Sequence, residues 1–364
     1  MNQLLIWLLL VPVIVGVAIW VVNRENRDMQ AVLVGVGAFV VVSFLVTLSL
    51  FFIAKGSATD DVEIWSGQVT GKTKDLGSYE QPYDCFCSTD SKGNRSCRTC
   101  YETHYTVKWD CQTTVGNFRI NDVDSTNKNR AYSTPDTPRW LQIAVGDPAS
   151  KRHNYTNYIQ AVPNSLFTPS SADLKAKFAS LIPAYPDKVY DFYKIDRVLT
   201  PGYSMPDIAQ WNQNLSLMLR ELGPTKQANA ILVIAKTDDP NYEYAIRDAW
   251  EGANKNDVVV LVGSKNFPTI DFVRVISWTK SEIFKVELRD RLMDAGVVNR
   301  QMIDVIGEQI GKNFVRRKMA EFEYLSNEID PPTWLVILDI LLVLAGGVGA
   351  HMLINNNNYS RRRF

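Results

Sequence analysis

Cysteine is the residue whose spacing in this chain points most directly to chemistry. A CxC pair and a CxxC pair lie within the stretch CFCSTDSKGNRSCRTC, and a fifth cysteine follows shortly after. The five are Cys85, Cys87, Cys97, Cys100 and Cys111. These spacings predict either an all-cysteine tetrahedral zinc site, with Cys111 or His104 as spare ligands, or two disulfides whose connectivity the spacing leaves open. The redox compartment decides between the two, because an oxidising environment drives thiols to disulfides.

Carboxylates form a second group of candidates. Asp238 and Asp239 follow the apolar run ANAILVIAKT, and Asp257 begins the next apolar run, DVVVLVG. Strand ends are where α/β folds place ligands, and calcium prefers carboxylate oxygens, so a metal site is one interpretation. In the other interpretation, Asp239-Pro240 begins a helix, whose N-terminus favours an acidic residue. We favour the helix start.

Three long apolar segments predict membrane-spanning helices, because each can cross about 30 Å of hydrocarbon. They cover residues 4–22, 31–54 and 333–354. The first segment lacks the basic start and the cleavage site of a signal peptide, so we expect it to remain as a span. Asp339 lies well inside the third segment, where an ionisable residue is a functional candidate or a hydrogen-bond partner of Ser43 or Thr47. Gly346 and Ala350 permit close helix contact within the chain or between copies.

Basic residues beside the spans predict how the chain crosses the membrane. Arg24 and Arg27 mark the loop between the first two spans as cytoplasmic, and the arginines at 361–363 place the C-terminus on the same side. The N-terminus and residues 55–332 then face the periplasm or another extracytoplasmic space, across an inner or plasma membrane. Because that space is oxidising, we favour disulfides over zinc and expect no cofactor.

The extramembrane part predicts two domains, since roughly 280 residues exceed the usual single core. Residues 62–166 are rich in Thr, Ser, Asn and Asp, and Tyr105, Val107 and Trp109 alternate with polar residues as in a half-buried strand. We expect a small β-domain with a Cys-rich loop, followed by a proline-rich connector over 167–204. Lys plus Arg and Asp plus Glu are balanced at 39 each, so nothing indicates a nucleic-acid partner.

Residues 205–325 predict alternating helices and strands. We expect the order helix, strand, helix, strand, strand, helix, helix, with the last helix over 300–325 leading toward the third span. The predicted fold class is therefore an α+β membrane protein with three transmembrane helices, a Cys-rich β-domain and an α/β domain.

The α/β order resembles the TPM domain, a membrane-tethered module found outside the cytosol of bacteria and in some organelles. The stretches ILVIAKTDDPNYEYAIRDAW, GANKNDVVVLVG and FVRVISW, the last with Arg274, carry the resemblance. It implies that acidic residues at strand ends bind calcium or take part in phosphate hydrolysis, as reported for some members. This chain departs from the family at its glycine-rich turn, where it has Ser277 to Lys280, and at a family glycine, where it has Asp257.

These observations predict a scaffold or modulator that binds another membrane or envelope protein through its non-cytosolic domains, with a homo-oligomer as a further possibility. The first alternative is a membrane-tethered, metal-dependent phosphatase or other hydrolase acting through the three aspartates. The second is a subunit of an oligomeric channel with Asp339 beside a wet cavity. Because His104, His153 and His351 are widely separated, no Ser, His and Asp constellation supports catalysis, and we favour a protein that is not an enzyme.

Overall fold

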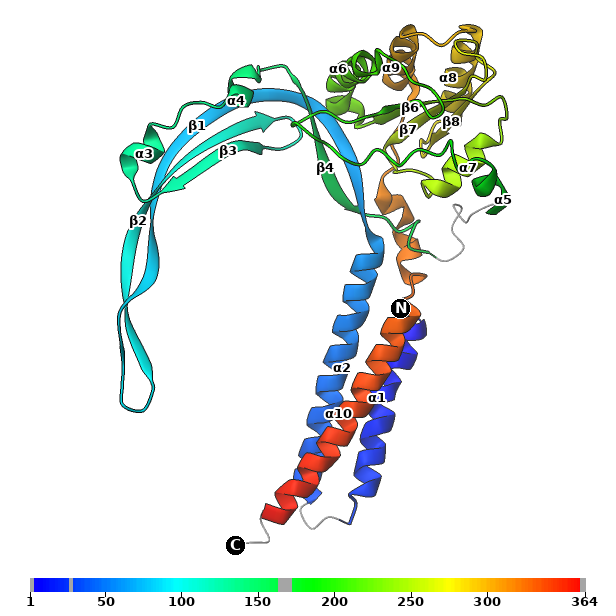
Figure 1. Cartoon of the computed structure of the whole chain (residues 1–364). Coiled ribbons are helices and arrows are strands. Elements are labelled where there is room, and N and C mark those ends of the chain that lie inside the picture. Colours follow the sequence, from blue (N-terminus) through cyan, green and yellow to red (C-terminus); the bar gives the residue numbers. More distant parts are fainter. Residues whose placement is uncertain (1–2, 26–28, 163–171, 361–364) are drawn as a thin grey trace. The chain divides into compact units, whose positions relative to one another are not determined.

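The structure is a computed structural model that describes residues 3–25, 29–162 and 172–360 (Figure 1). The chain is mixed α and β, and it divides into two compact units. One unit contains residues 1–62, 154–169 and 318–364, and the other contains residues 63–153 and 170–317. Arg27 and the arginines at 361–363, which served the orientation prediction, lie outside the described residues, as do residues 163–171 around the start of the predicted connector.

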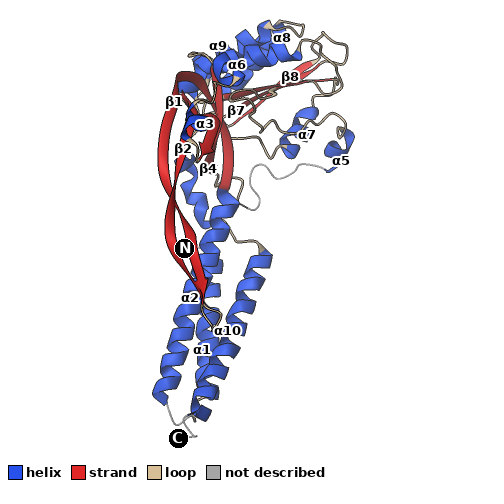
Figure 2. Cartoon of the chain, turned by 60° about the vertical axis from the view of Figure 1, so that its left-hand side comes forward, coloured by secondary structure: helices blue, strands red, loops and turns tan. Residues whose placement is uncertain are grey.

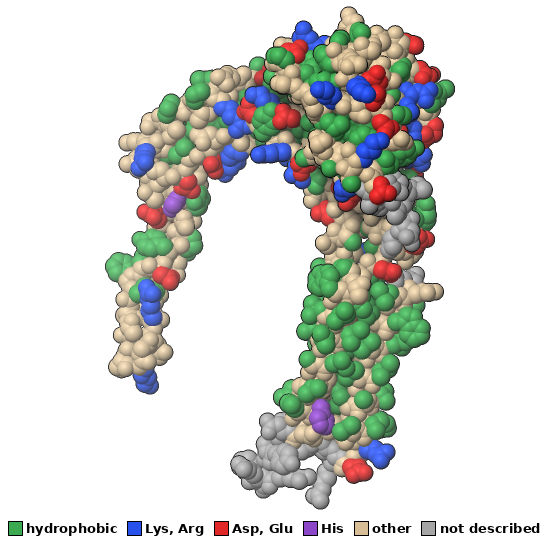
Figure 3. All heavy atoms as spheres, turned by 45° about the vertical axis from the view of Figure 1, so that its right-hand side comes forward, with side chains coloured by type: hydrophobic (Ala, Val, Ile, Leu, Met, Phe, Trp, Pro, Cys, Tyr) green, Lys and Arg blue, Asp and Glu red, His purple; other side chains and the backbone are tan. Residues whose placement is uncertain are grey.

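Three helices of the first unit are long and apolar enough to cross a membrane. They are α1 (Gln3–Val22), α2 (Met29–Thr59) and α10 (Thr333–Ser360). All three predicted spans fall within them, and hydrophobic side chains cover their visible face (Figure 3). Only a minority of residues in each apolar window is buried within the bundle, which is the pattern expected when lipid covers the outer faces.

Small residues allow these helices to approach closely. A side chain at Gly347 would place its Cβ 2.6 Å from Val15, and one at Gly346 would lie 3.5 Å from Phe39. Ala350 packs against the buried cluster of the helix bundle that contains Phe39. The small residues of the third span therefore serve contacts within one copy of the chain, and they give no separate support for contacts between copies.

Asp339 is 3% exposed and accepts hydrogen bonds from the Thr47 hydroxyl at 3.0 and 3.1 Å. The interaction joins α10 to α2, as the prediction of a Thr47 partner required. At another point of the bundle, Asn23 Nδ2 lies 2.9 Å from His351 Nδ1. Such interhelical polar contacts favour one packing of apolar helices over others.

The second unit contains most of a four-stranded sheet in the order β3-β2-β1-β4. Its strands are β1 (Asp60–Thr89), β2 (Arg95–Thr113), β3 (Phe118–Ser125) and β4 (Pro148–Thr156). Two short helices, α3 (Lys128–Tyr132) and α4 (Pro138–Gln142), follow β3. Val107 and Trp109 are fully buried in one cluster with Ala131 and Trp140 from these helices, which confirms the alternation predicted for this strand.

The same unit contains a second sheet in the order β5-β6-β7-β8. Its strands are β5 (Val198–Leu199), β6 (Asn229–Ala235), β7 (Asp257–Gly263) and β8 (Phe272–Ser277). The first three are parallel and β8 is antiparallel to β7. The helices around it are α5 (Ala172–Lys177), α6 (Ile208–Lys226), α7 (Tyr242–Ala249), α8 (Glu282–Asp294) and α9 (Gln301–Asn313).

Every side chain of β6 and β7 is buried, as in a central parallel pair covered on both faces. One face packs against α6, α8 and α9, and the other against α7 and the segment around Phe178. The order of elements predicted for 205–325 is thus observed, with one correction at its end. The expected helix over 300–325 ends at Asn313, and a 3₁₀ helix (Met319–Asn327) replaces its second half.

Candidate interaction surface

The β1–β2 hairpin extends well beyond the rest of its sheet. Its register runs from Val69 opposite Thr113 to Thr89 opposite Arg95. The neighbouring strand β3 pairs only with residues 105–111 of β2. On the other side of β1, backbone bonds join Val69 to residues 146 and 147, just before β4. Residues 79–104 therefore form a two-stranded ribbon, which we call the arm (Figure 2).

Two disulfides staple the outer end of the arm. They join Cys85 to Cys100 and Cys87 to Cys97, across 15 and 10 positions. The four cysteines lie within β1 and β2, so the expected Cys-rich loop is in fact the end of a hairpin. A two-stranded ribbon is marginal on its own, and cross-links of this kind offset the lack of a core. The fifth cysteine, Cys111, is a buried free thiol.

Phe86 lies between two disulfide-bonded cysteines and is the most exposed large hydrophobic residue among those described, at 81%. Its φ of 46° is rare for a bulky residue. The β1–β2 register shifts between residues 85 and 88, and a bulge of this kind redirects side chains. The staples therefore hold Phe86 outward, where it covers no part of its own fold.

Other large side chains of the arm are also exposed. Tyr83 is opposite Cys100 and Tyr101 is opposite Pro82, so the two tyrosines lie on opposite faces of the ribbon. Both are at least half exposed. Rigid aromatic side chains free of internal packing are typical anchors of protein interfaces. Sequence reasoning missed these residues, although their position beside the cysteines was a usable signal.

Hydrogen bonds fix the arm to β3 where it leaves the sheet. The Tyr79 hydroxyl donates to Asp124 at 2.7 Å, and His104 Nδ1 lies 2.6 Å from the other oxygen of that carboxylate. The rings of Tyr79 and His104 stack at 5.1 Å. The hydrogen bonds from Tyr79 and His104 lower the pKa of Asp124, and the bond to Asp124 raises the pKa of Tyr79. This cluster restrains the base of the arm.

The end of the arm is cationic. Residues 85–100 contain Lys92, Arg95 and Arg98 against one acidic residue, Asp90. Asp90 accepts hydrogen bonds from the backbone of Lys92 and Asn94 in the turn, and these bonds lower its pKa. Within the described part of the chain, none of the three cations makes an ion pair, and they remain available to an outside partner.

The second sheet separates the three candidate aspartates. Asp238 and Asp239 follow the carboxyl end of β6, where they pair with Lys265 (2.8 Å) and Lys177 (2.5 Å). Asp257 begins β7, which is parallel to β6, so it lies at the opposite end of the sheet. These aspartates do not form one site. Asp239 also accepts a hydrogen bond from Asn241 N at 2.9 Å, just before α7, as expected of a residue at a helix start.

Asp257 is fully buried and organises the junction between strands. Its carboxylate accepts hydrogen bonds from Tyr185 Oη (2.7 Å), Asn229 Nδ2 (2.8 Å) and Asn254 N (2.8 Å). These donors come from three separate segments of the chain, and together they satisfy the hydrogen-bonding needs of the buried carboxylate. Both carboxylate oxygens of Asp257 thus bind groups of the protein itself, and we assign the residue a structural role.

A buried guanidinium joins the two sheets. Arg197 is 1% exposed, and its Nη2 donates to Ser66 Oγ (2.8 Å) and Ser150 Oγ (3.2 Å) from the first sheet. Its Nε donates to Asn229 Oδ1 at 2.8 Å in the second sheet. Burial lowers the pKa of Arg197 to about 9. The sheet that carries the arm is therefore anchored to the α/β part by a charged, buried contact.

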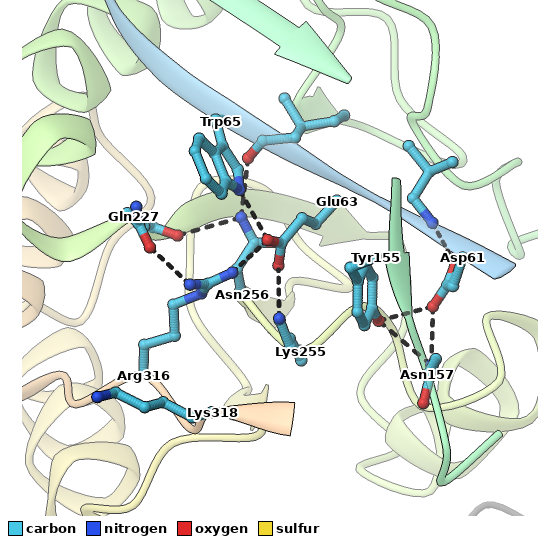
Figure 4. A network of polar contacts seen from close by, with 12 residues as sticks. Asp61, Glu63, Trp65, Tyr155, Asn157, Gln227, Lys255, Asn256, Arg316 and Lys318 are labelled. Carbon is cyan, nitrogen blue, oxygen red and sulfur yellow. Dashed lines mark hydrogen bonds and ion pairs between the residues drawn. The ribbon is translucent and has the colours of Figure 1, made fainter. Parts of the chain in front are cut away.

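A second buried network lies beside it (Figure 4). Glu63 of β1 is 2% exposed, pairs with Arg316, accepts from Trp65 Nε1 at 2.7 Å and lies 3.6 Å from Lys255 Nζ. Arg316 also donates to Gln227 Oε1 at 2.5 Å. The network fixes Glu63, near the start of β1, to Arg316 near the end of the unit, and so joins the sheet that carries the arm to the α/β part.

In the described ranges 3–25, 29–162 and 172–360, no three His, Cys, Asp or Glu side chains lie close enough together to hold a metal ion. Comparison of the chain with known protein families, with curated proteins and with solved structures found no match. Among the described features, the arm combines exposed aromatic side chains, cations without ion pairs and two cross-links.

Proposed function

We propose that this chain is a membrane-anchored scaffold or modulator that binds a membrane or envelope protein, either a different protein or a second copy, through the arm. Three apolar helices would anchor it, with the arm and the α/β part on the non-cytosolic side. The single observation that carries the proposal is the outward placement of Phe86 between two disulfides, because an exposed aromatic residue on a rigid support is costly unless a partner covers it.

The disulfides also support the proposed orientation, since they persist in oxidising compartments. The resemblance of the α/β part to the TPM domain remains a proposal, and we assign that part a supporting role. Hydrolysis through the aspartates is less well supported, because Asp238 and Asp257 lie at opposite ends of the sheet. A channel is less well supported as well, because Asp339 is bonded to Thr47 inside the helix bundle of one copy.

Site-specific photo-crosslinking in cells tests this proposal. A photoreactive phenylalanine analogue would replace Tyr101 on the arm or, as the control, Val286, an exposed residue of α8. We expect a discrete protein adduct from position 101 that position 286 does not give. Adducts with lipid alone from position 101, or identical adducts from both positions, would reject a protein-binding arm.

A further inference from the structure

The α/β part carries a groove with apolar and acidic side chains in its lining, whereas the end of the arm has an exposed aromatic residue and cations. Helices α6 and α9 border a cavity of about 630 Å³. Its apolar lining includes Leu217, Met218 and Ile303. Gly307 keeps the helices close, because a Cβ there would lie 2.7 Å from Met218 Cγ. Grooves between two helices with apolar floors are a common docking site for a protein segment.

Acidic residues border this groove. Glu221, Asp304 and Glu308 line it against one basic residue, Arg300. Glu221 pairs with Arg220 at 2.6 Å, and Glu308 with Arg291 (2.9 Å) and Lys312 (2.5 Å). Asp304 is exposed and makes no ion pair within the described residues. Glu221 and Glu308 are thus already paired within the chain, and Asp304 is the acidic residue of the described lining that an incoming cation meets unpaired.

The end of the arm has the matching features. Phe86 supplies an exposed aromatic side chain for an apolar floor, while Arg95 and Arg98 supply charges for an acidic border. Arginine and aromatic residues together are enriched where protein interfaces bury most binding energy. Opposite charges on the two surfaces would also fix the register of docking.

The arm cannot reach the groove of its own chain. Ser66 lies against α6, since a Cβ built on Gly223 would meet its carbonyl oxygen, so β1 starts close to the groove. From there to Thr89, β1 runs outward for about 75 Å of strand at about 3.3 Å per residue. Figure 1 shows the end of the arm well away from α6 and α9. Only a second molecule can bring the two surfaces together.

We propose that the end of the arm of one copy, Phe86 with Arg95 and Arg98, docks into the α6–α9 groove of another copy. This inference rests on the proposed function and names its partner at the arm. Two different surfaces meet in such a contact, so it is heterologous and repeats from copy to copy. Repetition gives a closed ring if the rotation closes and a filament if it does not.

Charge reversal on both surfaces tests the contact directly. The full chain in detergent micelles would be studied by light scattering during size-exclusion chromatography over a range of concentrations. The arm variant carries Arg95→Glu and Arg98→Glu, and the groove variant carries Glu221→Lys and Asp304→Lys. We expect each to weaken self-association by at least about tenfold, because like charges then face each other. Combining all four changes should restore association to within about threefold of the parent.

A matched control carries Lys128→Glu and Arg130→Glu on the exposed surface of α3, away from the arm's end. It should associate like the parent. Association that survives both reversals, or that the combined variant does not recover, overturns docking between copies. Flotation with anionic phosphatidylglycerol vesicles that is lost only in the arm variant, with association unchanged, would overturn it in favour of a lipid surface. A protein adduct from position 101 to a different protein, with a monomeric purified chain, would overturn self-docking but keep the scaffold.

Discussion

Arg197 and Ser66 lie 131 positions apart in the chain, yet the guanidinium Nη2 and the serine Oγ are 2.8 Å apart in a fully buried seam. The pair joins the sheet that carries the arm to the α/β sheet. Burial lowers the pKa of Arg197 to about 9, which leaves it protonated at neutral pH. Its hydrogen-bond partners among the described residues, Ser66, Ser150 and Asn229, are all neutral, so the buried charge depends on them.

We therefore expect Arg197→Ala to destabilise the second unit by about 3 kcal/mol, because Ser66, Ser150 and Asn229 lose a buried donor. Chemical denaturation followed by intrinsic fluorescence measures the change. Arg220→Ala is the matched control, since Arg220 of α6 also donates to the other part of the unit, at Gly146 O just before β4, but is partly exposed. Equal losses for the two variants would contradict a special role for the buried guanidinium.

The aspartates give a second prediction, which separates a structural network from a metal site. Asp257→Asn should destabilise the fold by about 3 kcal/mol, because an amide cannot accept from all three donors that surround the carboxylate. The double change Asp238→Asn and Asp239→Asn should leave the melting temperature nearly unchanged, since its ion pairs are exposed. Differential scanning fluorimetry with and without calcium checks both. A calcium-dependent rise that only the double variant loses would revive a metal site.

Strongly periodic elements were predictable from the sequence alone. The runs around Ile231 and Val260 are apolar throughout and form the central strands, and the alternation at Val107 and Trp109 gives a half-buried strand. The sequence also contained enough information to predict that Asp238 and Asp257 lie far apart. A strand, helix and strand in sequence favour a parallel pair, so a residue after one strand and a residue before the next lie at opposite ends.

The arm was harder to predict because its stability is not local. Residues between Tyr79 and Tyr101 lack a simple apolar alternation, and their extended form depends on cross-strand pairing and on two disulfides whose connectivity spacing leaves open. The buried contacts of Arg197 depend equally on chain segments that meet only after folding. Local pattern indicates neither of them.

Removal of the Cys85–Cys100 disulfide should loosen the arm alone. The chain-entropy model assigns about 3 kcal/mol to a cross-link that closes 15 residues, the separation of Cys85 from Cys100. Because the arm has little core, we expect this loss to appear as local opening. In the variant Cys85→Ser with Cys100→Ser, trypsin should cut after Arg95 and Arg98 at least about tenfold faster than in the parent.

Mass spectrometry of timed digests measures these rates, and cleavage after Arg130 in α3 serves as the internal control because the staples do not touch that helix. The melting temperature of the second unit should change little, since its buried clusters lie in the two sheets. Faster cleavage at all sites, or a large drop in melting temperature, would mean that the disulfides support the whole unit.

The buried thiol of Cys111 leads to the last prediction. Burial raises the pKa of Cys111 to about 11, and the nearby Lys72 opposes part of that effect. Only thiolate reacts with iodoacetamide, so at pH 8 ionisation alone should slow alkylation about 100-fold relative to a thiol with a pKa of about 9. Because the folded state holds this proton more tightly than the unfolded state, stability should fall as the pH rises from about 9 through about 11.

Alkylation mass spectrometry with parallel zinc quantification tests this directly. The native protein should take up no label at pH 8, the denatured protein one label at Cys111, and the denatured and reduced protein five. Ile143→Ala should speed labelling of the native protein, because Ile143 packs over Cys111 in the same buried cluster; Ile283→Ala on the exposed face of α8 should not. Stoichiometric zinc with five reduced thiols would reject the disulfides and, with them, the oxidising compartment on which the proposed orientation depends.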